Sequence, residues 1–288
     1  MDSPAEPYAS LRYFVLSHPS PHVAHVEINR ADKLNAFHEA MWLEMGSVFR
    51  ALSHDPEVRA VVLSGRGGKG FCAGLDVKAA AEGDMLGSSG GGKGKMDAAR
   101  TSQKLRRHIG EFQGSVGEIE RCDKPVIALL HGISFGLAID IACCADIRLA
   151  VADAKFSVKE VDIGLAADIG SLARLPKVVG SSSWVREVCL TARIFGAEEA
   201  QRVGFVSRVC ETKEKGLEAA TALAGLISEK SPVAVMGTKE ILKHSRDHSV
   251  DDNLRYTSVW NSAMLQSSDV QVALLSGIQK KKPRFEKL

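Results

Sequence analysis

Residues 124–170 read KPVIALLHGISFGLAIDIACCADIRLAVADAKFSVKEVDIGLAADIG, and this segment decides the fold. Its continuous apolar run at 126–130 is typical of a strand that is buried on both faces. A glycine-containing turn follows, and residues 137–145 then have a helix-compatible composition. A helix that starts directly after a tight turn presents free backbone N–H groups, which attract negative charge. Three carboxylates lie on the same segment: Asp140, Glu160 and Asp168.

A second segment has the same order of features. Its apolar run at 60–64 is followed by a glycine-rich loop at 65–70 and then by Ala73-Gly74-Leu75-Asp76. Two such turns can each direct one backbone N–H at a single oxygen atom, which is the arrangement of an oxyanion hole. Residues 65–70 also match GxGxxG, but a dinucleotide site requires those glycines to open a helix at once. Because Phe71, Cys72 and Gly74 intervene, a dinucleotide site is disfavoured.

The flanking regions predict further strands and helices. Residues 11–16 and 23–28 predict a hairpin, and Asn35 is a candidate cap for a helix over 37–53. Residues 83–95, GDMLGSSGGGKGK, predict a surface loop; they are not a P-loop, because glycine occupies the position of the magnesium-binding hydroxyl. Helical patterns follow at 96–121, 184–190, 214–229, 232–245, 251–265 and 269–278.

This order predicts two regions in an α/β protein. Strands dominate the first part of the chain and helices dominate the last third, which favours a core followed by a helical appendage. We place the core at residues 1–207 and the helical C-terminal region at residues 208–288.

Composition argues against several classes of function. The net charge of +2 and the absence of a basic stripe indicate no nucleic-acid partner, and no apolar run is long enough to span a membrane. Six scattered cysteines without a CxxC pair predict core residues in a reducing compartment. No group of side chains has metal-ligand spacing, so we expect no metal. Ser134 and Ser171 have no recognisable partner base, which disfavours a serine nucleophile.

Three ordered segments resemble the crotonase superfamily, the enoyl-CoA hydratases and isomerases. They are FCAGLDV at 71–77, HGISFGLAIDIACCADIRLA at 131–150 and FSVKEVDIGLAADIGSLARLPKVVG at 156–180, and the resemblance spans about residues 10–280. It implies a spiral of ββα units with a helical C-terminal region that trimerises, hence a homotrimer or a dimer of trimers. It also implies an acyl-CoA thioester substrate and no separate cofactor, because coenzyme A is part of the substrate.

The resemblance also assigns roles in substrate binding. The N–H groups of Leu75 and Leu137 would hold the thioester oxygen, and Leu137 stands where the family usually has glycine, so its side chain must point away from the thioester. Arg30 and Lys33 lie in the loop that contacts coenzyme A in the family. The remaining substrate-binding positions implied by the family motif are Ala73, Gly74, Asp76 and Val77.

The expected reaction depends on which acids occupy positions 140, 160 and 168. Family hydratases carry Glu at positions 140 and 160 and usually no acid at 168, whereas Asp140, Glu160 and Asp168 together resemble the dienoyl-CoA isomerase branch of the superfamily. Moving a diene from positions 3,5 to 2,4 removes a proton at C2 and returns one at C6, so two carboxylates must be spread along the acyl chain. We expect Asp168 to take the C2 proton, Glu160 to deliver the C6 proton and Asp140 to hold the polar network.

Other readings remain open from the sequence. An enoyl-CoA hydratase or a Δ3,Δ2-enoyl-CoA isomerase is an alternative on the same fold, and a non-catalytic binding protein of the crotonase fold, including an RNA binder, is an alternative of another class. Unsaturated fatty acid β-oxidation favours a peroxisomal or mitochondrial matrix location. The final Glu286-Lys287-Leu288 differs from the peroxisomal Ser-Lys-Leu address at its first position and does not decide between them.

Overall fold

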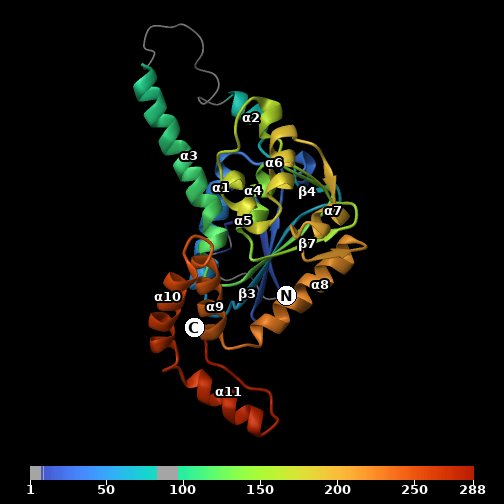
Figure 1. Ribbon diagram of the computed structural model, residues 1–288. Helices are drawn as coiled ribbons and strands as arrows, with labels where there is room; N and C mark the ends of the chain where they lie inside the picture. Colours follow the sequence, from blue (N-terminus) through green and yellow to red (C-terminus); the bar gives the residue numbers. More distant parts are fainter. Residues whose placement is uncertain (1–7, 9, 83–96) are drawn as a thin grey trace.

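The computed structural model describes residue 8 and residues 10–82 and 97–288, so the loop predicted at 83–95 lies outside the described residues. Its centre is a six-stranded sheet in the order β1-β2-β3-β5-β7-β10 (Figure 1). The hairpin pair β1 and β2 is antiparallel and every other neighbouring pair is parallel. The strands are β1 (Phe14–Ser20), β2 (Val23–Ile28), β3 (Ala60–Gly65), β5 (Val126–Leu130), β7 (Ile147–Val151) and β10 (Arg208–Cys210).

A second sheet of four short strands lies beside the first, in the order β4-β6-β8-β9. Each of β3, β5 and β7 is followed in the chain by one strand of this second sheet and then by helix, which is the ββα unit expected from the resemblance. The short strands are β4 (Gly70–Cys72), β6 (Ile133–Phe135), β8 (Lys155–Ser157) and β9 (Phe195–Gly196). The predicted α/β spiral of ββα units is therefore confirmed.

Helices cover both faces of the six-stranded sheet. The larger core cluster packs one face against α1, α3 and α4, whereas a smaller cluster packs the other face against α8. This two-sided cover explains the continuous apolar run of β5, which is buried throughout as predicted. Figure 1 shows the N-terminal half of α3 extending away from the sheets. The helices concerned are α1 (Glu39–His54), α3 (Ala98–Arg121), α4 (Leu137–Cys144) and α8 (Lys213–Ser228).

The helices predicted for the C-terminal third are present. Figure 1 places α9, α10 and α11 together at one end of the molecule, with α11 farthest from the sheets. The boundary placed at residue 207 stays a prediction; β10 and α8, which follow it, pack on the six-stranded sheet. The bounds are α6 (Ser182–Thr191), α7 (Ala197–Arg202), α9 (Pro232–His244), α10 (Val250–Met264) and α11 (Ser268–Ile278).

Asn35 does not cap α1, so this prediction was wrong. The helix begins at Glu39, and its N-cap residue His38 makes no side-chain cap hydrogen bond. Asn35 is instead fully buried with a positive φ of 56°. Its side chain accepts a hydrogen bond from the Arg30 N–H and donates to backbone carbonyls in the glycine-rich loop that precedes β4. The residue therefore ties two loops together beside the site described below.

Two features are absent from the described part of the chain. No helix within it is long and apolar enough to cross a membrane. The same residues contain no group of three or more His, Cys, Asp or Glu side chains placed to hold a metal ion.

Candidate active site

Two glycine turns adjoin each other, each directly after a strand of the second sheet. Gly74 has a φ of 99° and Gly136 a φ of 54°, a region that favours glycine. A Cβ atom added to Gly136 would lie 3.8 Å from the Cα of Gly74. Within the described residues, the N–H groups of Leu75 and Leu137 have no hydrogen-bond partner. Two free donors on adjoining turns are what an oxyanion hole requires.

Leu137 fits this arrangement in spite of its side chain. It is the first residue of α4, where a backbone N–H has no partner within the helix. The side chain is only 3% exposed and packs in the larger core cluster. A side chain at this position therefore leaves the N–H available, and the usual glycine is not needed for it.

Asp140 lies one turn further along α4 and is 1% exposed. Its Oδ1 accepts two hydrogen bonds from Ser171, one from the backbone N–H at 2.6 Å and one from the hydroxyl at 2.7 Å. Burial raises the pKa of Asp140 to about 7, and the negative charge of Glu160 acts in the same direction. The bonds from Ser171 oppose the rise but do not cancel it.

Glu160 begins a short 3-10 helix, η3 (Glu160–Ile163), directly beside the Gly136 turn. Its Oε1 lies 3.4 Å from the position that a Cβ atom on Gly136 would occupy. Its Oε2 is buried and has no hydrogen-bond partner among the residues that the structure describes. Burial raises the pKa of Glu160, and the negative charge of Asp168 adds to the rise. A buried carboxyl oxygen without a partner is rare in folded proteins and indicates a functional role.

Asp168 is the third of the predicted acids. Its side chain is exposed, whereas those of Asp140 and Glu160 are not. It precedes α5 (Ser171–Val178), and its backbone carbonyl accepts a hydrogen bond from the Gln113 side chain of α3. It lines a cavity of about 480 Å³ together with Arg174 and other polar residues. The charge of Glu160 raises the pKa of Asp140 and the charge of Asp168 raises that of Glu160, so the three predicted acids are neighbours in the fold. The cavity that Asp168 lines does not include Asp140 or Glu160, and their common role in one site stays a prediction.

The loop predicted to contact coenzyme A is held by an ion pair. Arg30 donates to Asp76 Oδ2 at 2.7 Å and to the Ala36 carbonyl at 2.7 Å. Its hydrogen bond keeps the pKa of Asp76 low, and Asp76 also accepts from the N–H of Ala79 in α2 (Val77–Glu82). Arg30 therefore holds in place the loop that contains Leu75. Lys33 is exposed on the same loop.

The other predicted binding residues are close by. The Ala73 N–H donates to the Leu34 carbonyl at 3.0 Å, which joins the two loops a second time. Val77 is exposed at the start of α2. The assignment of Arg30 and Lys33 to coenzyme A phosphates, and of residues 73–77 to the substrate, stays a prediction.

Sequence reasoning missed the residues that support the acids. Ser171 is the first residue of α5, after the N-cap Gly170, and nothing in the neighbouring sequence indicates that it contacts Asp140. Arg174 on the same helix donates to Glu120 of α3 at 3.0 Å, and Arg246 contacts the same carboxylate. No local pattern connects Glu120, Arg174 and Arg246, because they are far apart in the chain.

We expect Asp140→Asn to stabilise the protein at pH 8. The pKa of Asp140 is about 7 when folded and has an ordinary value of 3.8. The folded state therefore holds the proton more tightly, and the stability it contributes below pH 3.8 is lost as the pH rises through about 7. An amide cannot ionise, so the variant avoids this loss, which is up to ~4 kcal/mol. Urea unfolding at pH 8 and pH 5 measures the difference; equal gains at both pH values would contradict it.

The comparisons with known proteins identify the class. Residues 19–287 match the family model described as enoyl-CoA hydratase/isomerase, and the chain belongs to this family. It is 48% identical over 269 residues to the mitochondrial Delta(3,5)-Delta(2,4)-dienoyl-CoA isomerase of Homo sapiens, a match covering 93% of this chain and 79% of that protein. It is 42% identical to the peroxisomal enzyme of the same name from Arabidopsis thaliana, with 92% of this chain and 93% of that protein covered.

Solved structures agree on the fold. The crystal structure of enoyl-CoA hydratase from Bacillus anthracis superposes with a TM-score of 0.84 and 23% sequence identity, over 96% of this chain and 99% of that one. At this identity, the likeness concerns the fold alone.

Proposed function

We propose that this protein converts 3,5-dienoyl-CoA to 2,4-dienoyl-CoA in the β-oxidation of unsaturated fatty acids. The observation that carries the proposal is the third acid: the charge of Asp168 acts on Glu160, and Glu160 lies beside the Gly136 turn that precedes the free N–H of Leu137. The family acts on acyl-CoA thioesters, and the relatives described above are named for this isomerisation.

The proposed reaction begins at the thioester. With its oxygen held by the N–H groups of Leu75 and Leu137, loss of a C2 proton gives a dienolate whose negative charge is stabilised at that oxygen. Asp168 carries a negative charge that acts on Glu160, so it suits the role of base at C2. In this intermediate the electron pair of the broken C–H bond joins C1 and C2, and the thioester oxygen carries the charge. When C6 takes up a proton, that pair moves to form the C2–C3 double bond, the C3–C4 π pair forms C4–C5, and the C5–C6 π pair binds the proton.

Glu160 completes the reaction at the other end of the diene. Its raised pKa favours the neutral acid, which can donate a proton to C6. The C4–C5 double bond forms as that proton is added, so one proton leaves and one arrives. Asp140 exchanges no proton with the substrate in this scheme; it holds the polar network around the other two acids. No group other than the coenzyme A of the substrate is required for these steps.

Two substrates test the proposal. We expect purified protein to isomerise a 3,5-dienoyl-CoA with a kcat/KM at least about 100-fold above that for hydration of a 2-enoyl-CoA, because hydration does not use an acid at C6. Faster hydration would favour the hydratase alternative. No turnover of either thioester, together with salt-sensitive RNA binding, would favour a binding protein.

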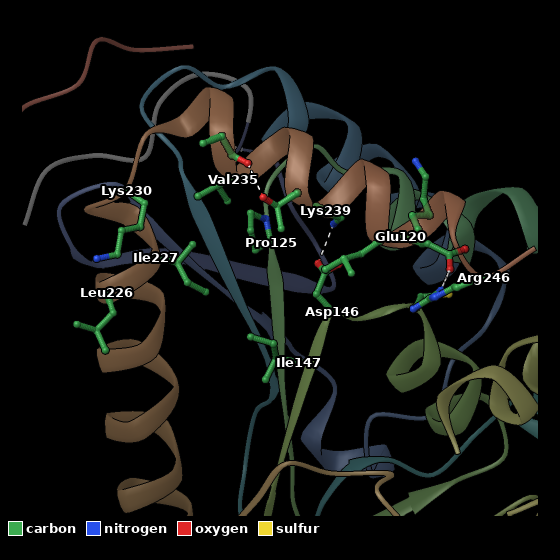
Figure 2. Close-up of a pocket in the computed structure, with 15 residues that line it drawn as sticks. Glu120, Pro125, Asp146, Ile147, Leu226, Ile227, Lys230, Val235, Lys239 and Arg246 are labelled. Carbon is green, nitrogen blue, oxygen red and sulfur yellow. Dashed lines mark hydrogen bonds and ion pairs between the residues drawn. The ribbon is translucent and has the colours of Figure 1, made fainter. Parts of the chain in front are cut away.

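We also propose that the chain assembles as a homotrimer or a dimer of trimers. Apolar side chains are exposed along α10 and α11, including Leu254, Leu274 and Ile278, the last at 80%. A groove of about 650 Å³ lies between α8 and α9. Figure 2 shows Leu226, Ile227 and Ile147 on one side of it and the Lys239–Asp146 ion pair beneath α9. A second copy of this chain would bury such surfaces, which are unusual on monomers.

Two charged substitutions test this assembly. We expect native mass measurement to give at least three times the 30.9 kDa of one chain. Leu254→Asp combined with Leu274→Asp places charges on the proposed contact and should shift the mass to that of one chain. Leu190→Asp changes an equally exposed leucine on α6 and serves as the control. A monomeric wild-type chain would contradict the proposal.

A further inference from the structure

The contact between Ser171 and Asp140 is unusual in its geometry. Both donors of Ser171 bond to the same oxygen of Asp140, Oδ1, at 2.6 and 2.7 Å. Ser171 is fully buried, so water cannot replace either bond. Across the described part of the chain, the second oxygen of Asp140, Oδ2, has no hydrogen-bond partner. The carboxylate is therefore held from one side only.

The backbone before Ser171 is shaped for this contact. Gly170 has a φ of 155°, and a Cβ atom there would lie 3.9 Å from Asp140 Oδ1 and overlap the Arg174 guanidinium. Any larger residue would therefore displace Arg174. Arg174 holds α5 to α3 through Glu120, and Lys177 donates to the Arg246 carbonyl at 2.8 Å. Helix α5 is thus held at its start through Ser171 and Arg174 and at its end through Lys177.

We infer that Ser171 is a positioning residue for the reaction: by holding one oxygen of Asp140 with two donors, it keeps that carboxylate beside Glu160 with its other oxygen open to the site. This inference rests on the proposed function and goes beyond it. Ser171 touches no reacting atom and acts only through Asp140.

The two donors also control the charge at Asp140. Hydrogen bonds from the Ser171 hydroxyl and N–H favour the ionised carboxylate and oppose the effect of burial on its pKa. Without the hydroxyl, Asp140 keeps its proton to higher pH. The negative charge of Asp140 beside Glu160 then develops only at higher pH, so any step that needs the ionised Asp140 also begins at higher pH. A helix cap without a role in the reaction would change stability but not this balance.

The test compares three substitutions at one position. Ser171→Ala removes the hydroxyl and keeps the N–H, and we expect kcat to fall about tenfold with KM within twofold, the loss of one charge-assisted hydrogen bond. The acidic limb of the pH–kcat profile should move to higher pH. Ser171→Thr keeps the donor and should restore both quantities. Ser171→Cys, a weaker donor of similar size, should be intermediate and replaces the alanine variant if that one does not fold.

A matched control and a readout without turnover complete the experiment. Ser64→Ala removes another fully buried hydroxyl, which contacts His25 Nε2 at 2.8 Å in the six-stranded sheet, and should leave the pH profile unchanged. Carbon NMR of labelled aspartate should show the Asp140 carboxyl titrating at higher pH in Ser171→Ala. An unchanged titration and profile would overturn the inference, even if kcat fell. Absent dienoyl-CoA turnover in the wild type would instead reject the proposed function, and the NMR titration would still decide the role of Ser171.

Discussion

Asp168→Asn and Glu160→Gln are each expected to lower kcat for 3,5-dienoyl-CoA isomerisation by about 1,000-fold, within the range for loss of a general acid or base. KM should change little, because the thioester is held by backbone N–H groups that neither substitution touches. Both side chains keep their size and lose only the ability to exchange a proton. Steady-state kinetics at saturating substrate measures the effect.

Deuterium labelling separates the roles of the two acids. If Asp168 takes the C2 proton and Glu160 supplies a different one, isomerisation in D2O should place one deuterium at C6. A single acid that carried the same proton from C2 to C6 would leave C6 largely unlabelled. Asp162→Asn is the control, because Asp162 is on the same segment but pairs with Lys159 at the surface. Near-normal isomerisation by both acid variants would refute the mechanism.

The second large effect is expected from removing one oxyanion donor. Leu137→Pro deletes the N–H at the first position of α4, where proline is otherwise well tolerated. We expect kcat to fall by about 100- to 1,000-fold, as for other enzymes that lose one such donor. The preceding Gly136 has a φ of 54° and a ψ of −117°, so it is already outside the helical region that proline disfavours in the residue before it.

Leu137→Ala is the matched control for this substitution. It removes the same packing from the core but keeps the N–H, so it should lower the free energy of unfolding by about 2–5 kcal/mol and leave kcat within a few-fold of wild type. Comparison of the two variants separates lost packing from a lost donor. Equal activities of Leu137→Pro and Leu137→Ala would show that this N–H does not hold the thioester oxygen.

The elements that sequence could predict are those specified by local patterns. The apolar run of β5 indicates a buried strand, and the glycines at 74 and 136 indicate turns with positive φ. The strand, both turns and α4 were therefore predictable. The ββα order and the family could be predicted because several such segments occur in a defined order along the chain. Amphipathic periodicity was enough for α8 to α11 because each is long and bounded by polar residues.

The features that could not be predicted depend on partners distant in the chain. Asn35 has the composition of a helix cap, but its partners are carbonyls about thirty residues away in the glycine-rich loop. The ion pair between Arg30 and Asp76 connects two loops in the same way. Ser171 reaches Asp140 across 31 positions, and only the fold shows that both of its donors meet one oxygen. Burial of Asp140 and Glu160 likewise exists only in the assembled protein.

The pairing of β4 with β6 has a consequence for how this protein could change its reaction. The two free N–H groups belong to the glycine turns that follow adjacent parallel strands, and strands in a sheet lie about 4.8 Å apart. The turns stay close beyond the strands, because a Cβ atom added to Gly74 would lie 3.9 Å from the Cα of Gly136. The gap is therefore set by main-chain geometry, independently of which side chains surround it. Substitutions of the acids beside these turns, Asp140 and Glu160, would therefore change the proton chemistry without moving the donors that hold the thioester oxygen.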